Sequence, residues 1–230
     1  IVVAFRMLPK VVWEMPSLGT FNLHASLLPN YRGAAPINWA IINGESKTGV
    51  TTFFIDDKID TGAMILNSEI AIEPEESAGQ LHDRLMLLGS ETVIDTLKVI
   101  ENGNVSTTIQ EDDAEIKTAY KLNKENCKID WTKSGDEINN LIRGLSPYPA
   151  AWTFLKDKDE ELNVKIYEAK LIPEDHTHEI GSLISSKKEI KIAIQNGFIQ
   201  LLSLQLPGKK RMLVAELLNG ITFSDTAKMY

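Results

Sequence analysis

The sequence predicts an α/β unit followed by a small strand-rich unit, a barrel or a sandwich. Helical and strand-like apolar patterns alternate over residues 1–103, which favours a layered α/β sheet. A polar stretch over 104–128, acidic at EDDAE, then interrupts the pattern. Several short strand patterns separated by Gly, Asn and Asp follow over 129–230. We therefore expect two domains, 1–103 and 129–230, joined by a linker at 104–128 that holds little regular structure.

The elements expected in the first domain each rest on their apolar spacing. Continuous or alternating apolar residues predict strands, and apolar residues at helical spacing predict helices that close at Gly44 and Gly103. Ser77 and Gln80 have the spacing of a capping box at the start of the longer helix. Strands are expected at residues 1–5, 19–27, 49–57 and 62–72. Helices are expected at residues 35–44 and 77–103.

The second domain begins with a short helix in this interpretation. Ser134 and Glu137 form another capping box, and the helix runs through Arg143 to Gly144. Trp131, Trp152 and Tyr148 are interpreted as packing residues where the domains meet. Strands are then expected at 150–156, 163–172, 181–186, 189–197 and 198–206.

The composition is that of a soluble globular protein and excludes several classes of function. The chain has 230 residues, 43% of them hydrophobic and 24% charged, and no apolar run long enough to span a bilayer. Its net charge of −8 excludes a nucleic-acid binder that works by overall charge. Cys127 is the only cysteine, so no internal disulfide can form, which fits a cytoplasmic location. The chain begins at Ile1 inside a strand pattern, so we expect a further segment upstream.

The strand pattern at 19–27 carries the strongest chemical signal. Asn22 and His24 are two positions apart, so on a strand they share a face, just before the loop that contains Pro29 and Gly33. Asp60 follows in a polar loop between two predicted strands. An amide donor, an imidazole and a carboxylate together can serve acyl transfer as oxyanion donor, general acid and base.

Each of these residues also has a plain structural interpretation. An Asn-X-His on a strand can be structural, and an Asp before Thr-Gly can be turn chemistry. The Asp-Thr-Gly sequence at 60–62 also occurs in aspartic proteases, where two such aspartates share a proton. This chain has a single copy, so a protease would have to be a symmetric dimer.

Two long segments favour the catalytic interpretation of these residues over the structural one. HASLLPNYRGAAPINWAIINGE, followed by GVTTFFIDDKIDTGAMI, resembles the formyltetrahydrofolate-dependent formyltransferases. The resemblance continues through KLNKENCKIDWTKSGDEINNLIRGLSPYPAAW and LPGKKRMLVAELLNG, so it covers essentially the whole chain. It implies a Rossmann-like formyltransferase domain that lacks its N-terminal part, followed by an OB-like barrel.

The resemblance also assigns roles to single residues. Asn22, His24 and Asp60 match the catalytic trio of that family. The stretch Ser26, Leu27, Leu28 and Pro29 matches the segment that lines the folate site. We expect Arg32, Gly33 and Gly62 to shape the loops. The exact form of the folate pocket near Arg6 is left open.

The reaction implied is direct formyl transfer from 10-formyltetrahydrofolate, without a metal or a covalent enzyme intermediate. The tail with IDWTKS and GKKRM favours the branch that formylates methionyl initiator tRNA for translation initiation. Amino-sugar formyltransferases and formyltetrahydrofolate hydrolases are the alternatives within the family. A tRNA-binding fragment without catalysis is the alternative outside enzymology. No membrane and no obligate protein partner are indicated.

A local basic cluster is the expected contact to the RNA. Lys209, Lys210 and Arg211 are adjacent in a turn, where such residues are often only a solvated surface, but they can also grip phosphates. His176 and His178 are close in sequence, yet two ligands in an acidic loop do not predict a metal site.

Overall fold

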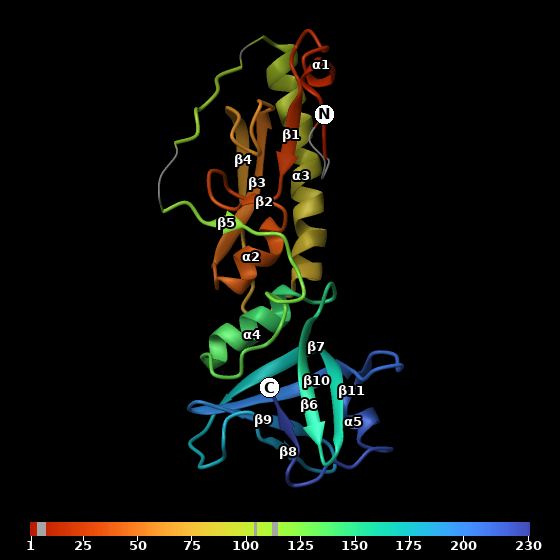
Figure 1. Cartoon of the computed structure of the whole chain (residues 1–230). Helices are drawn as coiled ribbons and strands as arrows, with labels where there is room; N and C mark the ends of the chain where they lie inside the picture. The colour runs from red at the N-terminus through yellow and green to blue at the C-terminus, as the bar shows by residue number, and fades with distance from the viewer. Residues whose placement is uncertain (4–7, 104, 112–114) are drawn as a thin grey trace. The chain divides into compact units, whose positions relative to one another are not determined.

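The computed structural model describes residues 1–3, 8–103, 105–111 and 115–230 and divides into two compact units. Unit 1 comprises 1–40, 45–76 and 80–121, and unit 2 comprises 41–44, 77–79 and 122–230. Figure 1 shows the α/β elements in the warm colours and the barrel strands in green to blue. The mixed α/β class and the barrel that follows it were both predicted from the sequence, and both are confirmed.

Unit 1 is built on a three-stranded sheet in the order β1–β3–β4, with antiparallel pairing throughout. Val2 adds a single parallel bridge to Asn22 on the free side of β1. A short parallel pair, β2 with β5, joins two segments far apart in the sequence. The elements are α1 (Lys10–Trp13), β1 (Phe21–His24), β2 (Arg32–Gly33), α2 (Pro36–Ile42), β3 (Lys47–Phe54), β4 (Met64–Ala71), α3 (Ala78–Glu101) and β5 (Thr118–Ala119).

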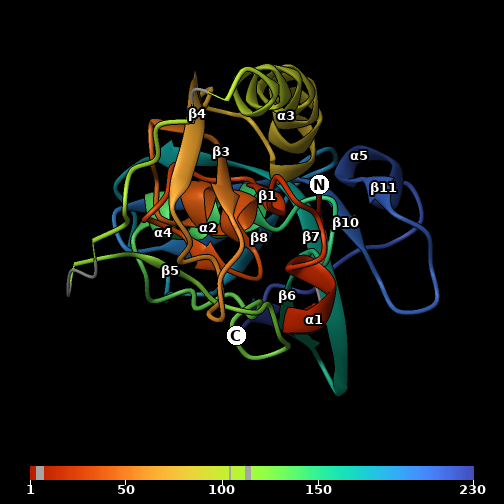
Figure 2. The ribbon, with the colours of Figure 1, turned by 90° about the horizontal axis from the view of Figure 1, so that it is seen from above.

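Helix α3 packs along this sheet and is seen nearly end-on in Figure 2. Phe21 of β1, Ile65 of β4 and Ile100 of α3 share one apolar cluster. Gly89 comes so close to Leu23 that an added Cβ would lie 2.9 Å from its side chain. Two buried hydroxyls, Thr52 and Thr96, bond each other at 2.8 Å across the same interface. The helix therefore fixes β1, the strand that carries Asn22 and His24.

Five of the six elements predicted for the first domain are found, with shifted ends. The strand expected at 19–27 shortens to four residues because the backbone turns away at the loop that contains Pro29. Of the strand expected at 1–5, only the bridge at Val2 is seen, and residues 4 and 5 lie outside the described residues. Gly44, with φ of +70°, ends helix α2 as predicted, and its N–H bonds the carbonyl of Ile41 at 2.9 Å.

The described residues of the stretch 104–128 contain little regular structure, as expected. They hold β5, an antiparallel bridge between Thr108 and Met64 and a parallel bridge between Lys128 and Trp152. The boundary between the two compact units falls between Lys121 and Leu122. The functional division into a catalytic domain, a linker and a tRNA-contacting domain stays a prediction.

Unit 2 is a β-barrel preceded by one helix, so the barrel rather than the sandwich is found. Its strands follow the order β12–β6–β7–β10–β9–β8, with β11 paired to β10. A bridge between Ser182 and Lys228 joins the two ends of the sheet, and Met229 donates to Gly181 at 2.8 Å. The elements are α4 (Gly135–Gly144), β6 (Ala151–Asp157), β7 (Glu160–Pro173), β8 (Leu183–Ser185), β9 (Ile190–Ile194), β10 (Gly197–Gln205), β11 (Met212–Leu213), α5 (Val214–Leu217) and β12 (Lys228–Met229).

The capping box predicted for α4 is confirmed, because the Ser134 hydroxyl accepts from the Glu137 N–H and the Glu137 carboxylate accepts from the Ser134 N–H. Trp131 and Trp152 pack in the barrel core, and the Trp131 indole donates to Thr153 Oγ1 at 2.9 Å. Their packing role is thus confirmed, while the expectation that they lie where the domains meet stays a prediction. The packing role expected for Tyr148 is wrong, since this residue is 83% exposed. Tyr148 lies in the turn at 145–149 that follows α4.

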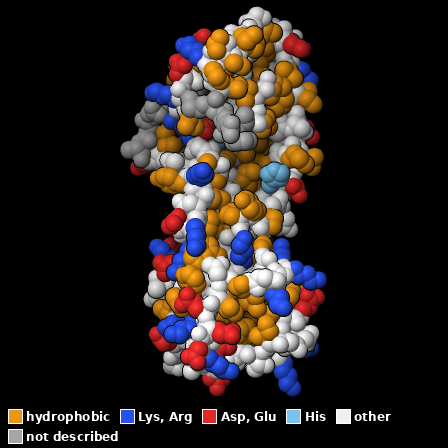
Figure 3. Space-filling view, turned by 45° about the vertical axis from the view of Figure 1, so that its right-hand side comes forward, with side chains coloured by type: hydrophobic (Ala, Val, Ile, Leu, Met, Phe, Trp, Pro, Cys, Tyr) orange, Lys and Arg blue, Asp and Glu red, His pale blue; other side chains and the backbone are white. Residues whose placement is uncertain are grey.

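The surface differs between the units. On the face in Figure 3, apolar side chains gather on unit 1, while on unit 2 they are interspersed with charged ones. Large exposed apolar residues of unit 1 include Val11 and Met15 near α1 and Met86 and Leu87 on α3. Among the described helices, none combines the length and the apolar character needed to cross a bilayer.

Candidate functional site

His24 lies at the end of β1 and is 7% exposed. Its Nε2 lies 2.8 Å from the carbonyl oxygen of Tyr31, so this nitrogen donates and carries a proton. Its Nδ1 lies 3.7 Å from Asp60 Oδ2, which is an ionic contact when the ring is charged but too long for a direct hydrogen bond. Nδ1 is therefore the ring nitrogen that remains free to exchange a proton with another group.

Asp60 stands opposite His24 in the loop between β3 and β4. Its side chain is 18% exposed, and Oδ2 accepts a hydrogen bond of 3.0 Å from the backbone N–H of Gly33. The residue has φ of +56°, in the left-handed region that non-glycine residues seldom occupy. The structure thus brings together His24 and Asp60, which are far apart in the sequence, as the prediction required.

Asn22 is half-buried and precedes His24 by two residues on β1. It pairs with Phe53 of β3, as His24 pairs with Thr51, so the two side chains leave the strand on the same face. This arrangement provides an amide N–H₂ and an imidazole on one face of the strand. It can stabilise negative charge that develops on a carbonyl oxygen.

The loop after β1 is closed by its own hydrogen bonds. The Ser26 hydroxyl is fully buried and donates to the Asn30 carbonyl at 2.7 Å. Thr51 Oγ1 donates to the Ser26 carbonyl and accepts from the Leu28 N–H. Leu28 is buried as well, whereas Leu27 and Pro29 are half-buried. Of the four residues predicted to line the folate site, these last two have side-chain surface that remains accessible.

The three residues expected to shape the loops make tight backbone contacts or bridging hydrogen bonds. Gly33 has φ of +119°, and an added Cβ would lie 2.5 Å from the Ala119 carbonyl oxygen. An added Cβ at Gly62 would lie 1.7 Å from the Phe54 carbonyl oxygen. Arg32 donates from Nε to Gln110 Oε1 at 3.0 Å. Neither glycine position can accept a side chain without a backbone shift.

Two residues with direct contacts to the trio were missed by the sequence analysis. Tyr31 supplies the carbonyl that holds His24, and Gln110 donates to the carbonyls of Asp60 and Gly62. A backbone carbonyl leaves no mark in the sequence. Gln110 lies in the polar stretch interpreted as a linker, so no periodicity or motif sets it apart.

Glu45 holds the loop that contains Tyr31 through a second set of polar contacts. Glu45 accepts from the Tyr31 hydroxyl and from Lys117 Nζ, each at 2.5 Å. Burial alone would raise the pKa of Glu45, but the hydrogen bonds from Lys117 and Tyr31 outweigh it and lower the pKa below its ordinary value. The carboxylate is thus held in its charged form, next to the loop that presents the Tyr31 carbonyl.

A polar pocket of about 320 Å³ opens beside the Asp60 loop. Asp56 organises its wall by accepting from the Thr61 hydroxyl at 2.9 Å and from the Lys58 N–H at 2.9 Å. The lining is mixed in charge, so it favours neither a cation nor an anion. It consists of Arg32, Asp56, Asp57, Lys58, Thr61 and Gln110.

In unit 2, the basic cluster predicted from the sequence divides into two parts. Arg211 forms an ion pair with Glu168, donates to Ser203 Oγ at 2.8 Å and lies 4.7 Å above the Tyr167 ring. Lys209 and Lys210 are exposed, and within the described part of the chain neither side chain has an ion pair. The two lysines are therefore available to an anionic partner, whereas Arg211 is already engaged.

His176 has a structural environment. Its Nε2 lies 2.8 Å from the carbonyls of Ile194 and Gly197, and its ring lies 4.4 Å from that of Phe198. Among the described residues, no group of three or more His, Cys, Asp or Glu side chains is arranged to hold a metal ion. The His176 ring therefore braces the β9–β10 hairpin.

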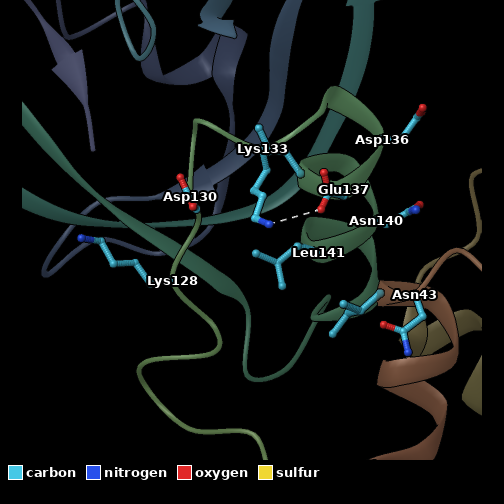
Figure 4. A pocket seen from close by; sticks show the side chains of 10 residues that line it. Asn43, Lys128, Asp130, Lys133, Asp136, Glu137, Asn140 and Leu141 are labelled. Carbon is cyan, nitrogen blue, oxygen red and sulfur yellow. Dashed lines mark ion pairs between the residues drawn. The ribbon is translucent and has the colours of Figure 1, made fainter. Parts of the chain in front are cut away.

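A larger pocket, of about 460 Å³, lies in unit 2 beside α4 (Figure 4). Lys133 reaches across it to Glu137 at 3.5 Å, and Leu141 and Ile138 provide an apolar floor. Lys128 and Asp130 line the opposite side. Its lining carries three acidic and two basic side chains, so it is mixed in charge and favours no single class of ligand.

Comparison with known proteins identifies relatives of the whole chain. A formyl transferase model matches residues 1–97, and a model of the formyl transferase C-terminal domain matches residues 121–222. Methionyl-tRNA formyltransferase of Flavobacterium johnsoniae is 89% identical over all 230 residues, and that of Flavobacterium psychrophilum is 67% identical. The chain spans 73% of each of these relatives.

The fold also has a solved counterpart. HypX from Aquifex aeolicus, in complex with tetrahydrofolic acid, superposes with a TM-score of 0.69. The match covers 95% of this chain and 38% of HypX, at 20% sequence identity. At this identity, the likeness supports the fold.

Proposed function

The chain belongs to the methionyl-tRNA formyltransferase family, and on that premise we propose that it transfers a formyl group from 10-formyltetrahydrofolate to the amino group of methionyl initiator tRNA. The reaction modifies the initiator for translation and would take place in the cytoplasm. Amino-sugar transfer and formyltetrahydrofolate hydrolysis are not favoured, because the relatives of high identity are methionyl-tRNA formyltransferases.

The single observation that supports this proposal is the pairing of His24 with Asp60 at the buried end of β1. Nδ1 of His24 and Oδ2 of Asp60 are 3.7 Å apart, and the Tyr31 carbonyl holds the other ring nitrogen. A ring held in this way has one nitrogen left for proton exchange. The nearby Asp60 carboxylate can accept a proton in turn.

The proposed step is a direct displacement at the formyl carbon. The amino nitrogen forms a bond to that carbon and loses a proton, and the bond from the carbon to N10 of the folate breaks as N10 gains one. Asn22 and His24 donate to the oxygen on which negative charge develops. His24, as an imidazolium, supplies the proton for the leaving nitrogen, and Asp60 receives the proton of the amine, directly or through a water.

Both partners in this reaction are substrates, and different parts of the chain are proposed to bind them. The half-buried Leu27 and Pro29 offer an apolar edge to the folate next to His24. Lys209 and Lys210, which are exposed, are proposed to hold tRNA phosphates. No metal is needed, since the charge that develops is met by Asn22 and His24.

The test is transfer of labelled formyl from 10-formyltetrahydrofolate to methionyl initiator tRNA by this chain. The product expected is formyl-methionyl-tRNA, formed in proportion to protein and abolished by acid denaturation beforehand. Release of free formate without labelled tRNA would instead indicate a hydrolase. Binding of tRNA with neither product would leave a non-catalytic tRNA-binding protein.

A further inference from the structure

Gln110 reaches the site from a segment outside the elements that carry the trio. Two residues earlier, Thr108 and Met64 exchange backbone hydrogen bonds of 2.9 Å each, which pins this segment to the start of β4. The Gln110 residue is 8% exposed, so its amide is nearly withdrawn from water. A buried amide of this kind is costly unless it is hydrogen-bonded.

The side-chain amide of Gln110 is hydrogen-bonded at both ends. Nε2 donates to the Asp60 carbonyl at 3.0 Å and to the Gly62 carbonyl at 2.8 Å. Oε1 accepts from Arg32 Nε at 3.0 Å. This set of contacts requires a side-chain amide, whose nitrogen carries two donor hydrogens and whose oxygen accepts. Gln110 therefore links the loop of Asp60 to the loop of Arg32.

These two loops are the ones that orient the Asp60 carboxylate. Gly33, next to Arg32, donates its N–H to Asp60 Oδ2 at 3.0 Å. Asp60 has the unfavourable φ of +56°, and the bond from Gln110 to its carbonyl holds it there. If that bond is lost, the backbone at Asp60 can relax and carry its carboxylate away from His24 Nδ1.

We propose that Gln110 is a positioning residue that sets the distance and direction between the Asp60 carboxylate and His24. The inference rests on the proposed function, since it assigns Gln110 a part in the same reaction. Gln110 does not touch the reacting atoms. It acts by fixing the carbonyl groups of Asp60 and Gly62, while Arg32 keeps the Gly33 N–H aimed at Oδ2.

The test compares Gln110→Met, which removes all three hydrogen bonds at similar length, with Gln110→Glu, which keeps the acceptor for Arg32. We expect Gln110→Met to lower kcat by roughly 10- to 100-fold, because displacement of a catalytic group by about 1 Å has effects of this order. KM for both substrates should change by less than about three-fold, since uniform binding is not affected. Gln200→Met is the matched control, because the Gln200 amide donates to Glu189 within unit 2, whereas the trio belongs to unit 1.

The pH profile separates positioning from a loss of folding. In Gln110→Glu, the introduced carboxylate cannot donate to either carbonyl when it is ionised, whereas the protonated carboxyl group regains one donor. The activity of Gln110→Glu relative to Gln110→Met should therefore rise as the pH falls. Unchanged kcat in Gln110→Met, or a defect confined to KM, would overturn the inference.

A second readout is independent of catalysis. Amide hydrogen exchange at the Gly33 N–H, which is protected by Asp60 Oδ2, should be faster in Gln110→Met and unchanged in Gln200→Met. Unchanged protection of Gly33 would overturn the inference. If the unsubstituted chain transfers no formyl group, the proposed function fails, and the exchange experiment still decides whether Gln110 positions Asp60.

Discussion

Around His24, the polar contacts join short stretches of chain that lie far apart in the sequence, whereas the barrel of unit 2 is a continuous ladder of strands around an apolar core. His24 depends on Tyr31, Asp60 and, through them, Gly33 and Gln110. The barrel depends on residues such as Ile166, Ile192 and Ile199, all fully buried.

This difference teaches that the two units respond to substitution in different ways. The site is held by a few hydrogen bonds, each with a defined direction, so the loss of one changes geometry before it changes stability. The barrel core is held by close packing, in which each side chain contributes through contact area. Substitutions in the core should therefore change stability before they change chemistry.

The largest effect is expected from His24→Ala and Asp60→Ala. Each should slow formyl transfer by roughly 10²–10⁴-fold, because general acid–base assistance is lost. Affinity for the folate should change little, since the donor site proposed lies in the following loop. The measurement is single-turnover transfer together with folate binding.

His82→Ala is the matched control for this prediction, because His82 is a surface residue of α3 paired with Asp83. Near-normal turnover in His24→Ala would remove the assignment of the site. Equal losses in His24→Ala and His82→Ala would point to a general loss of structure.

The next largest effect concerns the apolar core of the unit 2 barrel. Ile199→Ala on β10 should lower the free energy of unfolding of the barrel by about 2–5 kcal/mol, through lost burial and a cavity. Leu202→Ala on the same strand is the control, since Leu202 is 38% exposed. Amide hydrogen exchange of the barrel strands measures the effect. A fall in kcat of folded Ile199→Ala as large as that of His24→Ala would break the comparison.

A smaller effect concerns the basic turn. Lys209→Gln together with Lys210→Gln should weaken tRNA binding by about 10-fold and flatten the slope of log affinity against log salt by about 1 to 2, because two phosphate contacts are lost. Lys187→Gln with Lys188→Gln is the control, as these lysines are also adjacent and exposed on the barrel. Filter binding at several salt concentrations measures both. An unchanged slope would exclude the turn from the RNA contact.

The smallest effect is a pH dependence at Glu45. Its pKa is lowered in the folded state, so its contribution to stability is present above the pKa of the unfolded chain and is lost as the pH falls through the folded value. At pH 7, the free energy of unfolding of the unsubstituted chain should exceed that of Glu45→Gln by about 0.5–1 kcal/mol. The difference is small because solvent weakens partly exposed ion pairs. This gap should narrow as the pH falls below 4.5, the ordinary value for a glutamate. Thermal unfolding at several pH values checks it, and a constant gap would contradict the assignment.

Local patterns predicted much of the architecture. The barrel strands, the capping box of α4 and the helix end at Gly44 all depend on residues a few positions apart, and all were found. Asn22 and His24 were placed on one face of β1 by strand periodicity alone. The strand ends shifted because periodicity does not show where a backbone turns.

The sequence by itself predicted two units, the capped start of α4 and the shared strand face of Asn22 and His24. The assignment of Asn22, His24 and Asp60 to catalysis stays a prediction. Only the tertiary structure decided how Asp60 is held, which ring nitrogen of His24 stays free, and that Arg211 pairs with Glu168 while Lys209 and Lys210 remain exposed. The physical reason is the distance along the sequence between the residues that interact. Helix caps and strand faces follow from neighbouring residues, whereas Gln110 meets Asp60 across 50 positions only after the chain has folded back on itself.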